Sequence, residues 1–291
     1  MKWVQVSIET SAMAEDAISN LLMEMDSGGV YIKEDKLNSD RILVFAYFPP
    51  DDIIGERVSK INEYLENMRK IGINTGKSKV TIKQVDDEQW SESWKKFFKP
   101  LKIGKRIIVY PSWEDISNYQ SRDILIEIDP GMAFGTGGHS TTKLCLEILE
   151  EIIKGGEIVA DIGTGSGILA IGAVKLGASS VTAVDVDEKA IKIAKENLIK
   201  NKTIDAVKLL HRDLLSCSDD KYDIIISNIS RQASLSIIPM AKELMLENGK
   251  IVLSGILRRE AKEVHKSLES NNFNILNTTY DKEWSCILAG I

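Results

Sequence analysis

The pattern that most constrains this chain is a regular alternation of short apolar runs and amphipathic stretches, which extends from about residue 124 to the last residues. The apolar runs lack the strict alternation of apolar and polar residues that marks a half-exposed strand. Strands of this kind are buried on both faces, so helices must cover both sides of a mostly parallel sheet. The sequence therefore predicts a doubly wound α/β fold for the last two-thirds of the chain.

The amphipathic stretches repeat apolar residues every three to four positions, which is the spacing of a helix with one buried face. We expect strands at residues 124–128, 158–162, 181–186, 207–210, 223–227 and 251–253. We expect helices at residues 141–153, 168–176 and 189–200, with further helices between the later strands. Two last strands, 274–280 and 284–288, are separated by a short turn, which indicates an antiparallel hairpin at the sheet edge.

Residues 1–85 follow a different plan. Helical patterns that begin near Ala14 and Ile54 separate strand patterns at residues 2–8, 30–32, 42–48 and 80–82. The order β-α-β-β-α-β is the split βαβ plan of ferredoxin-like domains. No constellation of catalytic residue types stands in this part, which favours a binding domain over a catalytic one.

Residues 86–100 connect these two parts and carry four aromatic side chains at helical spacing, Trp90, Trp94, Phe97 and Phe98. This spacing is typical of an amphipathic helix that packs on a neighbouring domain, and Pro100 would end it. We therefore expect a first domain at residues 1–85, a linker helix at 86–100 and a second domain at 101–291.

The composition is ordinary for a globular protein, with 43% hydrophobic and 27% charged residues. The net charge of −6 counts against nucleic acid as the main partner and suits a basic protein partner. The first residues show no basic region followed by a long apolar run, and no segment is apolar over the length of a membrane span. We therefore expect a cytoplasmic enzyme or binding protein that does not engage a membrane.

The three cysteines, Cys145, Cys217 and Cys286, stand far apart and form no C-x-x-C pair. Spacing of this kind does not indicate a disulfide framework or a metal site. We expect reduced thiols and no bound metal.

A glycine-rich turn stands where the strand at 158–162 meets the following helix. It reads Asp161-Ile-Gly-Thr-Gly-Ser-Gly167, and Ile168 stands where a dinucleotide fingerprint would need a last glycine. The remaining pattern, D-x-G-x-G-x-G, is typical of nucleoside-binding methyltransferases with seven-stranded sheets. Asp185 follows about 20 residues later at the end of the next strand, where a carboxylate can accept both hydroxyl protons of a ribose. These residues predict a nucleoside cofactor rather than a merely tight turn.

Asn228 stands at the end of the fourth strand, on the edge of the sheet where ligands bind in this fold. Its amide oxygen and the carbonyl of Ile229 could both accept hydrogen bonds from an amine and so orient the lone pair of the amine. The alternative is an ordinary turn residue at a strand end. Asp213, after the third strand, could accept a hydrogen bond from an adenine amino group, or it could have no role.

The segment from Asp129 to Thr142, DPGMAFGTGGHSTT, is too particular for a generic loop. It resembles the signature of the ribosomal protein L11 methyltransferase family, which modifies the eleventh protein of the large ribosomal subunit. The resemblance covers essentially the whole chain. Three other segments are also similar to landmarks of that family, namely 90–95 before it and 255–257 and 283–284 after it.

The resemblance implies a seven-stranded, Rossmann-like methyltransferase domain preceded by a small ferredoxin-like α+β domain. It implies S-adenosylmethionine as the cofactor, and lysine side-chain and N-terminal amines of a large-subunit ribosomal protein as the substrate. The first domain would hold that protein, and we expect a monomer. The positions that would contact the cofactor are Thr142, Gly163, Asp185 and Asn228, and Asn228 would also be the catalytic residue.

Four residues leave questions open at this point. Ser230 and Arg231 stand where the family usually has an aliphatic residue and an alanine, which concerns the positioning of the substrate. His139 could order the loop ahead of a helix capped by Thr141 or Thr142, or it could accept a proton. Phe134 could wall the cleft or pack in the core. His211 and His265 receive no role.

Two other functions compete with protein methylation. A methyltransferase of the same fold could act on RNA or on a small molecule, although the acidic net charge counts against RNA. A protein could also bind S-adenosylmethionine without catalysis, although the intact glycine turn, Asp185 and Asn228 count against this.

Overall fold

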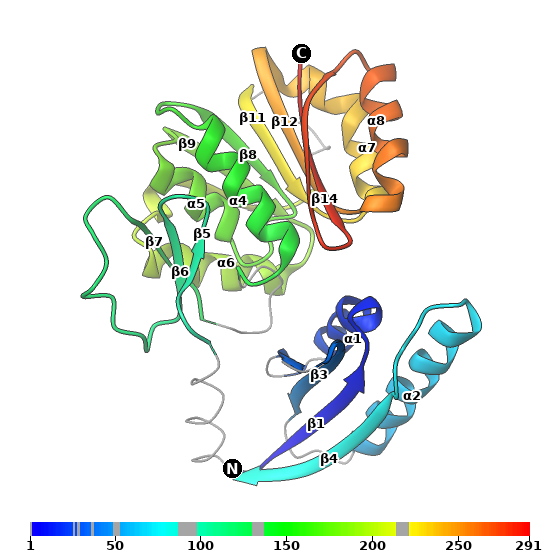
Figure 1. Ribbon diagram of the computed structural model, residues 1–291. Helices are drawn as coiled ribbons and strands as arrows, with labels where there is room; N and C mark the ends of the chain where they lie inside the picture. The colour runs from blue at the N-terminus through cyan, green and yellow to red at the C-terminus, as the bar shows by residue number, and fades with distance from the viewer. Residues whose placement is uncertain are drawn as a thin grey trace. The chain divides into compact units, whose positions relative to one another are not determined.

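The computed structural model describes residues 2–25, 27, 30–35, 38–48, 53–86, 98–129, 137–213 and 221–291 (Figure 1). The chain divides into two compact units, one that ends at Lys99 and one that begins at Pro100. Most of the predicted linker helix, residues 87–97, lies outside the described residues. Phe134 and Cys217 lie outside them too.

The first unit is a four-stranded antiparallel sheet with two helices. Its elements follow the order β1 (Lys2–Thr10), α1 (Ala12–Glu24), β2 (Val30–Asp35), β3 (Asn38–Phe48), α2 (Ile54–Lys70) and β4 (Lys79–Asp86). The strands lie in the order β2-β3-β1-β4. Every second residue of β1, such as Val6 and Ile8, is buried, because these side chains share one core with Ile18 of α1 and Ile61 of α2. Helices therefore cover one face of this sheet.

The second unit contains a seven-stranded sheet in the order β10-β9-β8-β11-β12-β14-β13. Five strands run parallel to one another, β8 (Ile158–Ile162), β9 (Ser180–Asp185), β10 (Val207–His211), β11 (Tyr222–Asn228) and β12 (Met245–Leu257). The hairpin of β13 (Asn274–Asp281) and β14 (Trp284–Gly290) adds two antiparallel strands at one edge. The prediction of a mixed α/β fold with a large, mostly parallel sheet is confirmed.

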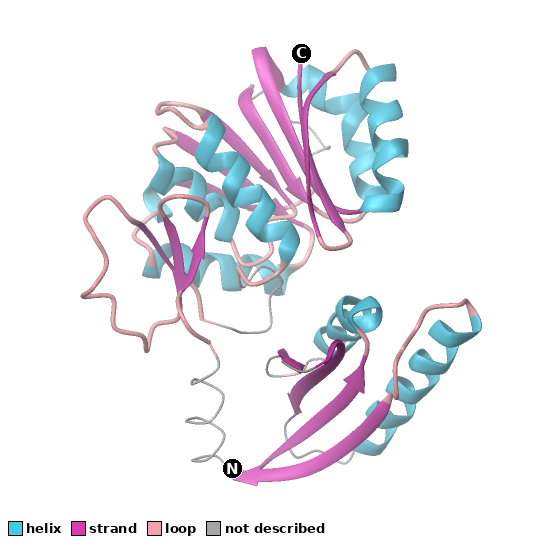
Figure 2. Ribbon diagram, viewed as in Figure 1, coloured by secondary structure: helices cyan, strands magenta, loops and turns pink. Residues whose placement is uncertain are grey.

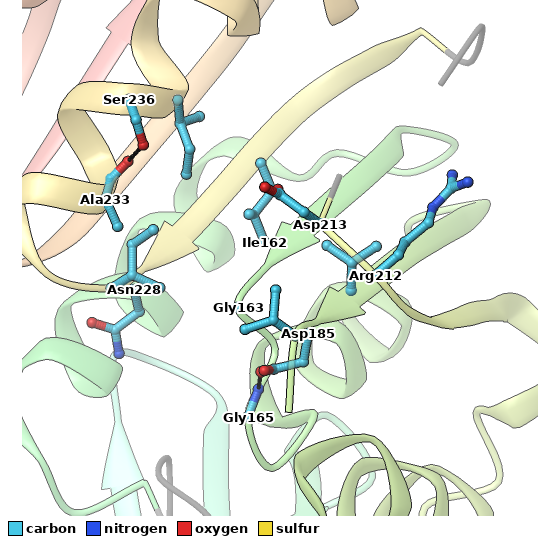
Figure 3. A pocket seen from close by; sticks show the side chains of 13 residues that line it. Ile162, Gly163, Gly165, Asp185, Arg212, Asp213, Asn228, Ala233 and Ser236 are labelled. Carbon is cyan, nitrogen blue, oxygen red and sulfur yellow. Dashed lines mark hydrogen bonds between the residues drawn. The ribbon is translucent and has the colours of Figure 1, made fainter. Parts of the chain in front are cut away.

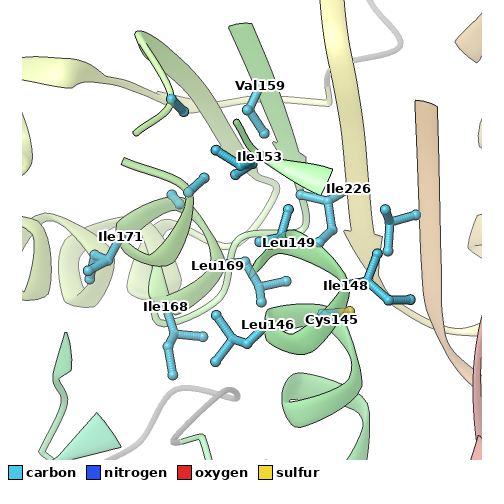
Figure 4. Close-up of a cluster of buried hydrophobic side chains, with 14 of the residues drawn as sticks. Cys145, Leu146, Ile148, Leu149, Ile153, Val159, Ile168, Leu169, Ile171 and Ile226 are labelled. Atoms are coloured by element: carbon cyan, nitrogen blue, oxygen red, sulfur yellow. The ribbon is translucent and has the colours of Figure 1, made fainter. Parts of the chain in front are cut away.

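Helices pack on both faces of this sheet (Figure 2). One face carries α4 (Ser140–Ile152), α5 (Ile168–Leu176) and α6 (Glu188–Lys200). Figure 4 shows part of that core, in which Val159 of β8 and Ile226 of β11 belong to the same cluster as side chains of α4 and α5. The opposite face carries α7 (Arg231–Ala241) and α8 (Ala261–Ser270). Neighbouring strand residues such as Val159 and Ala160 belong to opposite cores, which explains why the strands are apolar on both faces.

Two features of this unit differ from the prediction. The segment expected at 124–128 does not join the large sheet, since β5 (Leu101–Ile103), β6 (Ile107–Tyr110) and β7 (Ile124–Glu127) form a separate three-stranded sheet. The buried Ile107 and Ile126 of this small sheet extend the core beside α5. Strand β12 is also much longer than the predicted 251–253. Within the described residues, no helix is long and apolar enough to span a membrane.

Candidate active site at the carboxyl edge of the large sheet

The turn from β8 into α5 requires glycine at three alternate positions. Gly163, Gly165 and Gly167 have φ angles of 75°, 54° and 82°, a region that residues with a Cβ atom rarely adopt. The amide groups of Gly163 and Thr164 both donate to the carbonyl oxygen of Val184 on β9, at 2.9 and 3.0 Å. The turn is therefore held against the neighbouring strand at the carboxyl edge of the sheet.

Asp185, the last residue of β9, lies against this turn (Figure 3). Its Oδ2 accepts a hydrogen bond from the amide of Gly165 at 2.9 Å, and its Oδ1 accepts one from the amide of Asp187 at 3.0 Å. A carboxylate has about four lone-pair sites, so further acceptor capacity remains on both oxygens. The sequence proposed this side chain for a ribose, and the structure places it next to the glycine turn.

Asp161 belongs to the same turn, and the sequence interpretation quoted it without a role. The side chain is fully buried, and its Oδ2 accepts hydrogen bonds from Thr164 Oγ1 at 2.7 Å and from the amide of Ala170 at 3.1 Å. Its Oδ1 has no partner among the described residues. Burial, with a smaller contribution from the charge of Asp185, raises the pKa of Asp161 from 3.8 to about 7.

A pocket of about 380 Å³ opens beside the turn. Of the residues that the sequence singled out, six line it, namely Gly163, Gly165, Asp185, Asp213, Asn228 and Ile229. The sequence interpretation did not select the other lining residues, which are Ile162, Val184, Val186, Arg212, Ala233, Ser236 and Ile237. The sequence does contain a signal for Val186, because this apolar residue directly follows Asp185 at the end of a strand. In the structure its side chain is 72% exposed. The residues of α7 carry no such signal, since only the packing of that helix brings them to the pocket.

Asn228 ends β11 and lies on the other side of Gly163 from Asp185 in Figure 3. Its Nδ2 lies 3.5 Å from Oγ1 of Thr142, a fully buried residue of α4. The structure thus connects Thr142 to Asn228, although Thr142 is not among the residues that line the pocket. The Oδ1 of Asn228 is buried and has no hydrogen-bond partner among the described residues. A buried amide oxygen without a donor is costly, so this atom is suited to an incoming N–H group.

The two residues after Ile229 hold α7 in place. Ser230 is the N-cap of α7, and its Oγ accepts a hydrogen bond from the amide of Ala233 at 3.5 Å. Arg231 pairs with Glu263 of α8 and has its Nε 4.0 Å from Glu260 Oε1. These contacts give both residues a structural role at the start of α7.

His139 caps α4 itself, so the expectation that Thr141 or Thr142 would cap that helix is wrong. Its Nδ1 lies 2.7 Å from Thr141 Oγ1 and accepts from the amide of Thr141 at 3.3 Å. The imidazole also makes an edge contact with the ring of Trp284, with the centroids 5.2 Å apart. These contacts favour the ordering role for His139.

The other residues left without a role make local contacts. Nε2 of His211 lies 3.0 Å from the carbonyl oxygen of Val186, and Nε2 of His265 lies 3.0 Å from Thr278 Oγ1. Cys145 and Cys286 are free, buried thiols whose sulfur atoms are 3.9 Å apart. Among the described parts of the chain, no group of three or more His, Cys, Asp and Glu residues could hold a metal ion.

The similarity of this chain to known proteins extends over almost its full length. Residues 2–290 match the family model described as ribosomal protein L11 methyltransferase (PrmA). The chain is 40% identical to the ribosomal protein L11 methyltransferase of Caldanaerobacter subterraneus subsp. tengcongensis, over 99% of this chain and 98% of that protein. It is 36% identical to the protein of the same name from Bacillus subtilis, over 99% of each.

A solved structure supports the same relationship. The crystal structure of the ribosomal protein L11 methylase from Lactobacillus delbrueckii subsp. bulgaricus matches with a TM-score of 0.62 at 33% identity, over 66% of this chain and 98% of that one. The resemblance seen in the segment from Asp129 to Thr142 is therefore confirmed along the whole sequence. With a family model matched from residue 2 to residue 290, this protein belongs to the ribosomal protein L11 methyltransferase family.

Proposed function

We propose that this protein transfers methyl groups from S-adenosylmethionine to lysine side-chain and N-terminal amines of ribosomal protein L11. Family membership supports the reaction and the substrate protein. The observation that carries the assignment to amines is the buried Oδ1 of Asn228, which has no donor among the described residues and lies at the pocket beside the glycine turn.

The residues of the pocket fit S-adenosylmethionine. Asp185 retains acceptor capacity for the ribose hydroxyls, and Gly165 beside it has no side chain that would keep a ligand from the backbone of the turn. The exposed side chain of Val186 offers an apolar surface for adenine, and Asp213 offers an acceptor for its amino group. When bound, the sulfonium supplies a methyl group that is already activated toward a nucleophile.

The protein must bring a neutral amine to that methyl group. A free lysine has a pKa near 10.4, so its ammonium form dominates at neutral pH and has no lone pair to donate. The Oδ1 of Asn228 and the carbonyl oxygen of Ile229 would accept the two N–H groups of the neutral amine. This leaves the lone pair of the amine directed away from both oxygens, and the orientation lowers the entropic cost of an in-line transfer. Burial against Ile162, Ile229 and Ile237 favours the uncharged amine.

The finer architecture belongs to the same proposal. The order of the seven-stranded sheet supports a Rossmann-like methyltransferase domain at residues 101–291, and the order β2-β3-β1-β4 supports a ferredoxin-like domain at residues 1–85. We assign residues 86–100 to a linker helix and the first domain to substrate recognition. The protein would act as a cytoplasmic monomer without direct contact to nucleic acid.

The test is methyl transfer by Asn228→Ala to purified ribosomal protein L11, measured with a radiolabelled methyl donor. We expect kcat to fall on the order of 100-fold, because the amine loses the acceptor that orients it, while KM for the ribosomal protein changes little. Asn277→Ala, at an exposed position of β13, is the matched control and should keep the wild-type rate.

Three results would contradict the proposal. The wild-type protein could bind S-adenosylmethionine without transferring its methyl group, which would make it a binding protein. It could methylate RNA or a small molecule in preference to the ribosomal protein. Finally, Asn228→Ala could retain the wild-type turnover, which would remove the role of this side chain.

A further inference from the structure

Strand β12 is irregular at the carboxyl edge of the sheet, next to the end of β11. Its pairing with β14 shifts register between Leu253 and Ile256, so Ser254 and Gly255 form a β-bulge. Gly255 has a φ angle of 79°, which lies in the region that favours glycine. On the other side of β12, Ser254 stays in register with Asn228 of β11. The bulge therefore lies directly beside the proposed amine acceptors.

The missing side chain of Gly255 leaves space for the backbone of Ile229. A Cβ atom at position 255 would overlap the carbonyl oxygen of Ile229, and it would lie 2.8 Å from the carbonyl carbon and 3.0 Å from the amide nitrogen. These atoms belong to the main chain, so no rotation of a side chain can relieve the overlap. Any larger residue at position 255 must displace the Ile229 peptide.

A second glycine, Gly163 of the cofactor turn, contacts Ile229 from another side. A Cβ atom at position 163 would lie 2.5 Å from Cγ2 of Ile229. Gly163 thus packs against the side chain of Ile229, and Gly255 packs against its backbone. Gly163 in the turn after β8 and Gly255 in β12 thus contact this residue from two directions, which leaves its carbonyl oxygen little freedom to move.

The bulge is also tied to β14 by buried hydroxyl groups. Ser254 Oγ donates to the carbonyl oxygen of Ser285 at 3.1 Å, and Ser285 Oγ donates to the carbonyl oxygen of Ile256 at 2.9 Å. Both serines are fully buried. These bonds hold the two residues on either side of Gly255 and so define the position of the bulge.

We infer that Gly255 is a positioning residue for methyl transfer, because it sets where the carbonyl oxygen of Ile229 stands beside Asn228. The inference rests on the proposed function, in which these two oxygens orient the amine. Gly255 touches neither cofactor nor amine in this account. It acts through the Ile229 peptide.

The test compares Gly255→Ala with Gly156→Ala. Gly156 has a φ angle of 97° and nothing within 4 Å of an added Cβ atom, so its substitution imposes similar backbone strain without the contact. For Gly255→Ala we expect kcat on ribosomal protein L11 to fall on the order of 100-fold, because a displacement of about 1 Å disturbs the amine. KM for the ribosomal protein and the dissociation constant of S-adenosylmethionine should stay close to wild type. Gly156→Ala should keep the wild-type kcat.

A wild-type kcat in Gly255→Ala would overturn the inference. If Gly255→Ala fails to fold, as judged by loss of S-adenosylmethionine binding in calorimetry, Ser254→Ala decides. This variant removes the hydroxyl group that donates to Ser285 and lies 3.5 Å from the carbonyl oxygen of Thr141, and it adds no atoms. A several-fold lower kcat with unchanged cofactor binding would support the inference, and an unchanged kcat would overturn it. If Asn228→Ala keeps the wild-type kcat, both the proposed function and this inference are wrong. If Asn228→Ala has a low kcat and Gly255→Ala keeps the wild-type kcat, only this inference is wrong.

Discussion

Asp185 performs two tasks with one side chain. Its oxygens accept the amides of Gly165 and Asp187, which fixes the carboxylate beside the glycine turn. In the proposed complex the same oxygens also accept the ribose hydroxyls. Sequence spacing predicts the second task, because a carboxylate at this strand end is typical of nucleoside-binding folds. The contact between Asp185 and the amide of Gly165 depends on the positive φ angle of Gly165, and the spacing of residues in the sequence does not predict this angle.

We expect Asp185→Ala to weaken S-adenosylmethionine binding by about 1.5–3 kcal/mol, the usual worth of a hydrogen bond to a charged group. Calorimetry on the folded variant measures this directly. Asp187→Ala removes a carboxylate two positions away, one that caps α6 through the amide of Lys189 and does not line the pocket. If both variants weaken binding equally, the loss reflects net charge, and the ribose assignment is wrong.

At the scale of elements, the turn from β8 into α5 is built around a buried acid. With a single oxygen, Asp161 accepts hydrogen bonds from Thr164 in the turn and from the amide of Ala170 in the first turn of α5. Because burial raises its pKa to about 7, the folded protein holds a proton here at mildly acidic pH. The unfolded chain does not hold that proton, since the ordinary pKa of the group is 3.8.

This difference predicts how stability depends on pH. Unfolding between about pH 4 and about pH 7 releases the proton of Asp161, so its contribution to the free energy of unfolding decreases as the pH rises through this window. Asp161→Asn cannot ionise and should lack this decrease. Urea unfolding of both proteins at about pH 5 and about pH 8 tests the point. Parallel pH dependence in the two proteins would show that Asp161 does not titrate in this range.

Helix α7 supplies a second prediction at this scale. Arg231 pairs with Glu263 of α8 and with Glu260, which directly precedes α8, and the charged side chains are 29–53% exposed. Exposed ion pairs of this kind contribute little, so Arg231→Ala should cost less than about 1 kcal/mol of stability. Because Arg231 is engaged with α8, KM and kcat for the ribosomal protein should remain unchanged. A KM raised about ten-fold would instead show that Arg231 contacts the substrate.

At the scale of the whole molecule, the chain separates binding of the cofactor from the proposed recognition of the substrate. Every residue that lines the pocket belongs to the unit that begins at Pro100. The unit from Met1 to Lys99 has its own core, formed by β1, β3, α1 and α2. A recognition domain with an independent core can hold a protein substrate while the other domain performs the transfer.

We therefore expect a truncated protein that begins at Pro100 to bind S-adenosylmethionine with wild-type affinity and to lose nearly all activity on intact ribosomal protein L11. Circular dichroism and calorimetry establish that the truncated protein is folded. A short lysine-containing peptide serves as the matched substrate, and both proteins should methylate it at similar, low rates. Wild-type rates of the truncated protein on the intact ribosomal protein would show that the first domain has no recognition role.

The sequence alone determined the features that rest on local rules. Apolar periodicity predicted the parallel strands and the helices that cover them, and strand-end positions predicted that Gly163, Asp185 and Asn228 would meet at one edge. These predictions succeed because parallel strands bring their carboxyl ends together whatever the details of packing.

Only the tertiary structure decided the features that depend on contacts between distant segments. The small sheet of β5, β6 and β7 is separate because parallel pairing of β6 with β7 buries Ile107 and Ile126 beside α5. The bulge at Gly255 matters because its open space is filled by the backbone of Ile229, which directly follows another strand, β11. Neither relation leaves a periodic or spacing signal in the sequence, since each depends on which atoms meet after the chain has folded.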